Sequence, residues 1–145
     1  MAQDLAKQNE IMTKLFSYIL FSGLWIASFC ALNAQAPQEI MKSIETAIKN
    51  KDVVQLSQFF NKDLEVNLLD DERVYAKNQA QLVIRDFFAK NPLTKFNLIH
   101  VGGSGDSWYG MGLYESSTGQ FDTNVFIKKY GTVYLIDRIR FENKE

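Results

Sequence analysis

The chain has 145 residues, of which 46% are hydrophobic and 13% are aromatic. This length fits one domain, and the apolar share supplies a core, so a multidomain enzyme and a wholly disordered chain are excluded. The 16 basic side chains and 17 acidic ones give a net charge of −1, which argues against nucleic-acid binding. One Cys and one His form neither an internal disulfide nor a Cys/His zinc site, so we expect no metal and no cofactor.

The N-terminal part of the chain carries the three parts of a secretory signal peptide. Lys14 precedes an apolar run over residues 15–30, and Ala34 and Ala36 follow in an A-x-A pattern of small residues. We therefore predict a signal peptide over residues 1–36 that is cleaved after Ala36, with cleavage after Ala34 as the alternative.

An uncleaved anchor is the other interpretation of this segment, because residues 15–38 carry no charge and are long enough to span a bilayer. Both interpretations export the rest of the chain to the periplasm or the cell exterior, and cleavage leaves no stable membrane span. Met12 begins a more typical signal peptide than Met1, so we expect it to be the true start. Cleavage also removes Cys30, which leaves a cysteine-free domain over residues 37–145 that suits an oxidising compartment.

Two helices are predicted at the start of the mature domain. Ile40, Ile44 and Ile48 lie on one face of an amphipathic helix that ends near residue 50. Asp52 is placed to cap a second, short helix. The apolar face of that second helix would consist of Val53, Leu56, Phe59 and Phe60.

A strand and a third helix follow. Residues 64–68 alternate between apolar and polar, which predicts a strand, and the acidic run 70–72 predicts a turn. Apolar spacing predicts a helix over residues 77–89 that stops before Pro92, because proline disfavours helical geometry in the residue before it. Ala76, which precedes this helix, lacks a side-chain oxygen to cap it.

The last third of the chain changes to a period of two. This pattern predicts four strands, over residues 94–101, 108–114, 121–130 and 133–141. The turns between them are short, so we expect an antiparallel meander. The same alternation places His100 on the face of Phe96 and Leu98, and Asp137 on the apolar face of Ile139.

Six short segments occur in a characteristic order along the mature domain. They are Leu68-Leu69-Asp70, Val74-Tyr75-Ala76-Lys77, Ile84-Arg85-Asp86-Phe87-Phe88, Asn91-Pro92, His100-Val101-Gly102-Gly103 and Tyr109-Gly110-Met111-Gly112. With these segments, the chain resembles a family of uncharacterised exported Bacteroidetes proteins of the DUF4783 type over residues 40–141. The resemblance implies an α+β, NTF2-like (cystatin-like) cone fold. In this fold three N-terminal helices would pack on the concave side of a curved antiparallel sheet, in the order ααβαββββ.

Candidate catalytic residues are few. An acid such as Asp137 on an apolar strand face is costly unless it is paired or wet, and His100 is the one histidine of the chain, a residue type that commonly serves as a general acid or base. NTF2-like enzymes hold acids in their cone pocket, so the resemblance makes Asp137, His100 and Asp122 the catalytic candidates. Tyr75 and Tyr109 would complete a ligand pocket with Asp137 and His100. The structural alternative, in which Asp137 pairs with a neighbouring cation and His100 is a sheet residue, is favoured because no nucleophile or ligand set accompanies them.

Two other features have simple structural explanations. The glycine-rich segment 102–105 lacks the lysine of a phosphate-binding loop and lies between strands, so it is interpreted as a hairpin turn. Arg138 and Arg140, with Lys128 and Lys129 on the neighbouring strand, form either a basic patch for an anion or the solvated face of the sheet.

Two functions from different classes follow. The first is an exported, non-catalytic domain that binds a small molecule, a peptide, a glycan, or a second copy of itself through its aromatic-rich sheet. The second is a small-molecule lyase or isomerase that uses Asp137 with His100 or a tyrosine. Convergence of Asp137 and His100 in a closed apolar pocket would favour the enzyme, and an exposed or paired Asp137 would favour the binding domain.

Overall fold

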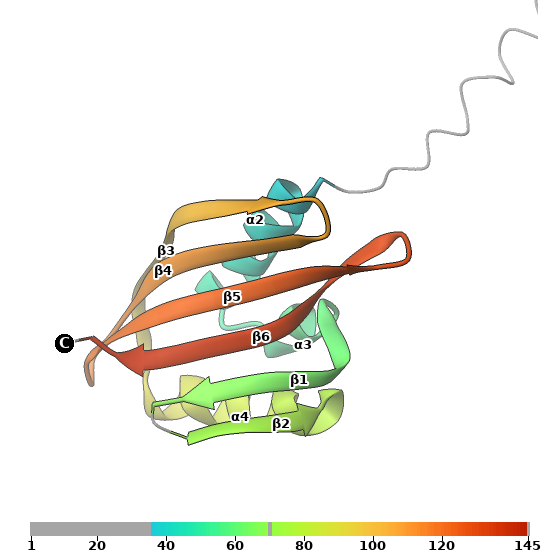
Figure 1. Cartoon of the computed structure of the whole chain (residues 1–145). Helices are drawn as coiled ribbons and strands as arrows, with labels where there is room; N and C mark the ends of the chain where they lie inside the picture. Colours follow the sequence, from blue (N-terminus) through green and yellow to red (C-terminus); the bar gives the residue numbers. More distant parts are fainter. Residues whose placement is uncertain (1–35, 70, 145) are drawn as a thin grey trace, which may run out of the picture. The chain divides into compact units, whose positions relative to one another are not determined.

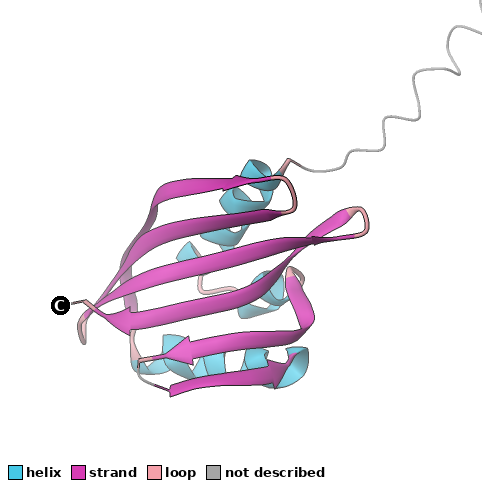
Figure 2. Cartoon of the chain, in the orientation of Figure 1, coloured by secondary structure: helices cyan, strands magenta, loops and turns pink. Residues whose placement is uncertain are grey.

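The computed structural model describes residues 36–69 and 71–144, which form six strands and three helices (Figures 1 and 2). Residues 1–35 of the predicted signal peptide, with Met12 and Ala34, lie outside the described residues, and Ala36 directly precedes α2. Among the helices that are described, none is long and apolar enough to cross a membrane.

The three helices lie on one side of the sheet and leave its other face uncovered (Figure 1). They are α2 (Pro37–Lys49), α3 (Val53–Ser57) and α4 (Lys77–Lys90). Helix α2 packs on β3 (Leu93–Ser104), whereas α4 packs on β1 (Phe60–Leu68) and β2 (Asp71–Ala76). The remaining strands are β4 (Ser107–Ser116), β5 (Gln120–Tyr130) and β6 (Val133–Asn143).

The six strands form one curved sheet in the order β2-β1-β6-β5-β4-β3. Strands β3 to β6 form the predicted antiparallel meander. Strand β1 pairs parallel to β6, which joins the N-terminal hairpin to the meander and leaves β2 and β3 as the edges.

Three predicted helix boundaries are confirmed. The backbone N–H of Gln55 donates to Asp52 Oδ1 at 2.8 Å, so Asp52 caps α3. Ala76 precedes α4 without a side-chain cap. Helix α4 ends at Lys90, two residues before Pro92, as the geometry of the residue before proline requires.

The predicted order ααβαββββ is wrong in one element. The run that was expected to be a turn contributes Asp71 and Glu72 to strand β2, so the observed order is ααββαββββ. Strand β2 is a short, charged edge strand, and exposed edges commonly carry charges that prevent pairing with other chains. Its insertion also means that α4 follows a β-hairpin and is not one of three N-terminal helices.

The second helix is shorter than its apolar residues suggest. Helix α3 ends at Ser57, and Phe60 is the first residue of β1, where it is 2% exposed. The strand is also longer at its start than the predicted 64–68. Phe60 is therefore a core residue of the sheet, and the polar run that follows it lies within the strand.

The core lies between the helices and the sheet. Ile44 and Ile48 from α2, Leu56 from α3 and Ile84 from α4 are fully buried in it. The sheet side of this core is aromatic. Phe87 and Phe88 of α4 contact aromatic rings of the sheet with centroids 4.7 to 5.9 Å apart, and these rings belong to Tyr114, Phe121 and Phe141.

Candidate functional site

Asp137 lies at a β-bulge of β6 and not on the buried face where alternation placed it. Phe126 pairs with Arg138 and Ile127 with Ile136, so Asp137 is the extra residue between two pairs. Buried residues of a regular strand are two positions apart, but Ile136 and Ile139, which are both fully buried, are three positions apart. The extra residue of the bulge accounts for this difference. A bulge thus explains an acid in an otherwise apolar strand.

The carboxylate of Asp137 is bound by two neighbouring side chains. The Tyr130 hydroxyl donates to Asp137 Oδ1 at 2.6 Å, and Asn61 Nδ2 donates to the same oxygen at 3.2 Å. The hydrogen bond to Asp137 raises the pKa of Tyr130. Asp137 therefore has the structural role of joining β1, β5 and β6, and none of its hydrogen-bond partners is His100.

His100 also lies beside a bulge, and its predicted face is wrong. Leu98 pairs with Gly112 and His100 with Met111, which leaves Ile99 as the extra residue, 76% exposed. The shift moves His100 to the uncovered face, where its Nε2 lies 3.2 Å from the Tyr109 hydroxyl.

His100 and Asp137 do not converge. Strands β4 and β5 separate them, and three strand spacings of about 4.8 Å put the two strands about 14 Å apart. The other candidates lie elsewhere. Asp122 is exposed on β5 and lines a polar hollow at the ends of β1 and β6, while Tyr75 lines a different hollow against α4. The pocket predicted from Asp137, His100, Tyr75 and Tyr109 is therefore not formed.

Aromatic side chains fill the space between the helices and the sheet, where a cone pocket was expected. Tyr114 is fully buried there, and its hydroxyl donates to the backbone carbonyl of Asn91 at 2.6 Å. Burial raises the pKa of Tyr114 to about 12. A small molecule would have to displace this cluster to enter the interior.

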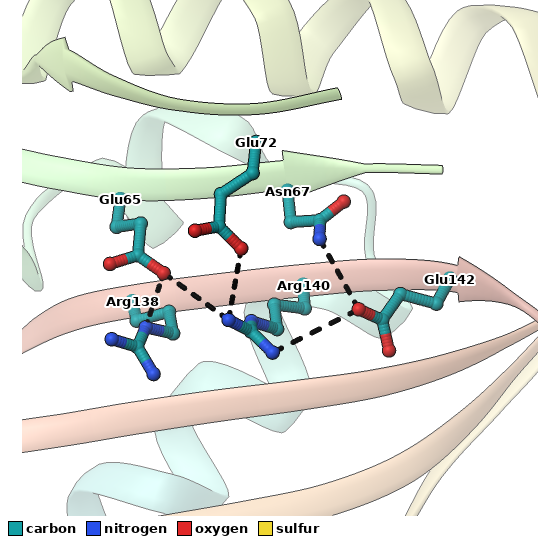
Figure 3. A network of polar contacts seen from close by, with 6 residues as sticks. All are labelled: Glu65, Asn67, Glu72, Arg138, Arg140 and Glu142. Carbon is teal, nitrogen blue, oxygen red and sulfur yellow. Dashed lines mark hydrogen bonds and ion pairs between the residues drawn. The ribbon is translucent and has the colours of Figure 1, made fainter. Parts of the chain in front are cut away.

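A polar network crosses β6, β1 and β2 on the uncovered face (Figure 3). Glu65 Oε1 lies 2.5 Å from Arg138 Nε, without the alignment of a hydrogen bond, and 3.4 Å from Arg140 Nη2. Arg140 Nη2 also lies 3.0 Å from Glu72 Oε2. Carboxylates from β1 and β2 therefore neutralise both arginines, which do not form a basic patch for an anion.

The other half of the uncovered face is apolar and aromatic. Tyr109 and Phe126 lie on adjacent strands with ring centroids 6.3 Å apart, and the guanidinium of Arg138 lies 5.5 Å from the Phe126 ring. Next to Tyr109 on the same face of β4, Met111 is 47% exposed and Leu113 is half-buried. The sequence indicates an aromatic-rich meander, but the face that each aromatic side chain occupies depends on the bulges.

Among residues 36–69 and 71–144, no group of three His, Cys, Asp or Glu side chains is arranged to hold a metal ion. The carboxylates of the uncovered face are instead used as partners for Arg138 and Arg140.

Comparison with solved structures identifies close structural relatives. A DUF4783 family protein from Bacteroides uniformis is 21% identical with a TM-score of 0.69, over 72% of this chain and 96% of that one. One from Bacteroides ovatus is 27% identical with a TM-score of 0.68, over 71% and 94% of the two chains. An NTF2-like protein of unknown function from Shewanella baltica is 12% identical with a TM-score of 0.57, over 74% and 90%. No curated protein matches the chain.

This chain has a mixed α+β fold with a curved six-stranded sheet, and the solved structures that share its fold include an NTF2-like protein. The family model for DUF4783, a domain of unknown function, matches residues 41–142, which is most of the sequence and nearly all of the described fold. The chain therefore belongs to the DUF4783 family.

Proposed function

We propose that the protein is an exported, non-catalytic interaction domain that associates with a second copy of itself through the uncovered face of its sheet. The exposure of Met111 in the middle of β4 carries this proposal. Met111 is 47% exposed, and it adjoins half-buried Tyr109, Leu113 and Phe126 in the apolar half of the face. A contiguous apolar patch of this kind marks a surface that another molecule covers.

The size of the face fits a dimer. Five strand spacings of about 4.8 Å make it about 24 Å wide, and ten residues of strand are about 33 Å long, so it offers at most about 800 Å². Stable interfaces bury about 800 Å² on each partner. In a two-fold symmetric dimer the same patch of both copies forms the interface, so the apolar half of one copy can pack against the apolar half of the other.

The charges of the face are compatible with a second copy. Glu65 lies against Arg138 and Arg140, and Arg140 also pairs with Glu72, so opposite charges are matched within each copy. Two such faces meet without a large excess of one sign. Burial would leave these pairs intact, which matters because an unpaired buried charge is strongly destabilising.

Sedimentation equilibrium of the purified protein and two lysine variants tests the dimer. Met111→Lys adds a charge to the centre of the face and should shift the protein to monomer. The matched control is Leu82→Lys, which changes a residue of α4 that is 57% exposed on the helical side, and it should remain dimeric. A monomeric parent protein, or equal dimerisation of both variants, would show that this face does not associate.

Export is tested on the expressed full-length precursor. We expect intact-mass and N-terminal sequence analysis of the periplasmic protein to show Pro37 as its first residue. Replacing both Ala34 and Ala36 by Arg should leave the precursor unprocessed, because signal peptidase requires a small residue before either of the two predicted cleavage sites. Recovery of an unprocessed parent protein in the cytoplasm contradicts the export proposal, whatever its oligomeric state.

A further inference from the structure

A hollow on the helical side of the sheet lies between α4 and the β1–β2 hairpin. Its volume is about 260 Å³. Its floor is apolar and consists of four side chains, Leu68, Tyr75, Val83 and Phe87. Phe87 is buried, and the other three are half-buried. Concave sites with apolar floors and a few polar groups at the rim are typical of small-molecule binding.

Leu69 forms one lip of this hollow with an unusual backbone conformation. Its φ is +64°, which is unfavourable for a residue with a branched side chain. The Leu69 N–H donates to the carbonyl of Phe141 at 2.7 Å, which stabilises this conformation. The side chain of Leu69 is 39% exposed at the opening, so the chain presents an apolar group there instead of burying it.

Among the residues that the structure describes, the rim of the hollow carries one acid and one base that are available to a ligand. Asp86 and Lys90 lie one turn apart on α4, the spacing and order that favour a helical ion pair. Within the part of the chain that the structure describes, neither is paired with an opposite charge. The other acid of the rim, Asp71, is engaged by Arg73 at 2.8 Å.

We propose that this hollow binds a free α-amino acid with an apolar side chain. The apolar floor would take the side chain, the Asp86 carboxylate the ammonium group, and the Lys90 ammonium the carboxylate. A ligand with one charge would leave one of these two groups without a partner. The site lies on the opposite side of the sheet from the dimer face, so its occupancy is independent of self-association.

Isothermal titration of the purified protein with L-phenylalanine tests the proposal, with phenethylamine and 3-phenylpropionate as single-charge analogues. We expect saturable binding of phenylalanine, and each analogue to bind about three- to fivefold more weakly, the effect of one partly exposed charge pair. Equal binding of all three compounds, or no saturable binding of phenylalanine, overturns the proposal.

Variants locate the binding site. Asp86→Asn should weaken phenylalanine more than 3-phenylpropionate, and Lys90→Gln should weaken it more than phenethylamine. The matched controls, Asp106→Asn in the β3–β4 turn and Lys42→Gln on α2, remove the same charges at exposed positions outside the hollow and should change nothing.

Two further variants separate this proposal from folding defects and from the dimer. Val83→Phe should fill the hollow and abolish binding in a protein whose circular dichroism and thermal transition remain cooperative. If that variant fails to fold, the pair of charge variants still decides the outcome. Met111→Lys should bind phenylalanine as the parent does, so binding that is lost only in the monomeric variant would place the ligand at the dimer face and overturn this site.

Discussion

The hydroxyl of Tyr130 donates a 2.6 Å hydrogen bond to Oδ1 of Asp137 across the β5–β6 hairpin. Asn61 of β1 donates to the same oxygen, so one carboxylate joins three neighbouring strands at the bulge of β6. Asp137 is the acid that the sequence marked as a catalytic candidate. Its neighbours account for it as a structural residue, because its carboxylate already accepts hydrogen bonds from two side chains of neighbouring strands.

Tyr130→Phe should lower the free energy of unfolding by about 1 kcal/mol, which is below the range of about 1.5 to 3 kcal/mol for a hydrogen bond to a charged group because Tyr130 is 38% exposed. Urea denaturation measures the change. The same substitution in an Asp137→Asn background should cost less, because the charged acceptor is gone. Equal costs in the two backgrounds would mean that the hydroxyl and the carboxylate do not interact in solution.

The bulges explain which site residues could be predicted from the sequence. Alternation correctly identified the four strands of the meander. It misplaced His100 and Asp137 because one extra residue, Ile99 in β3 and Asp137 itself in β6, reverses the faces beyond it. Nothing in the period of a single strand reveals a bulge, since its position depends on pairing with the neighbouring strand.

Strand β2 escaped prediction for a different reason. Its first three residues, Asp71, Glu72 and Arg73, are all charged, and sequence patterns assign such charged runs to turns. An edge strand tolerates them because one of its sides faces solvent. The hollow beside α4 was missed for the same reason, since it exists only where β2 folds back over the helix.

Glu65→Gln should destabilise the protein by about 1 to 3 kcal/mol, because it leaves the partly buried Arg138 and Arg140 with less compensating charge. The matched control is Glu115→Gln, which removes the partner of the largely exposed Lys95 at 3.5 Å and should cost less than about 1 kcal/mol. Chemical denaturation at low ionic strength compares the two. A Glu65 variant as stable as the Glu115 variant would show that the network contributes no more than an ordinary surface pair.

Gly112→Ala should be among the most damaging small substitutions in the sheet. A Cβ at Gly112 would lie 2.6 Å from the backbone carbonyl oxygen of Asn97 on β3, so the two strands would have to separate. We expect a loss of at least about 2 kcal/mol, in the range of steric overpacking. Gly119→Ala is the control, because its Cβ would meet only the Phe121 ring at 3.7 Å.

Thermal denaturation of the two alanine variants gives the comparison directly. The Gly119 variant should melt within a few degrees of the parent, or slightly above it, because alanine reduces the entropy of the unfolded chain. A Gly112 variant with the same melting temperature as the Gly119 variant would contradict the close approach of β3 and β4 at this position.

The buried hydroxyl of Tyr114 predicts a loss of stability in strong alkali. Its pKa is raised to about 12 in the folded protein by burial, whereas a tyrosine in the unfolded chain loses its proton near pH 10. Between these values the folded state binds more protons than the unfolded state, so stability falls as pH rises, by about 1.4 kcal/mol per pH unit from this group. Below pH 10 the contribution is fully present.

Tyr114→Phe isolates this contribution from other alkaline effects. Near pH 7 the variant should be less stable than the parent by about 1 kcal/mol, because the hydrogen bond to the Asn91 carbonyl is lost. The difference should shrink, and can reverse, as pH rises from 10 to 12, since phenylalanine does not titrate. Urea denaturation across this range measures it. Parallel stability curves for parent and variant would mean that the Tyr114 hydroxyl reaches solvent and ionises in the folded protein.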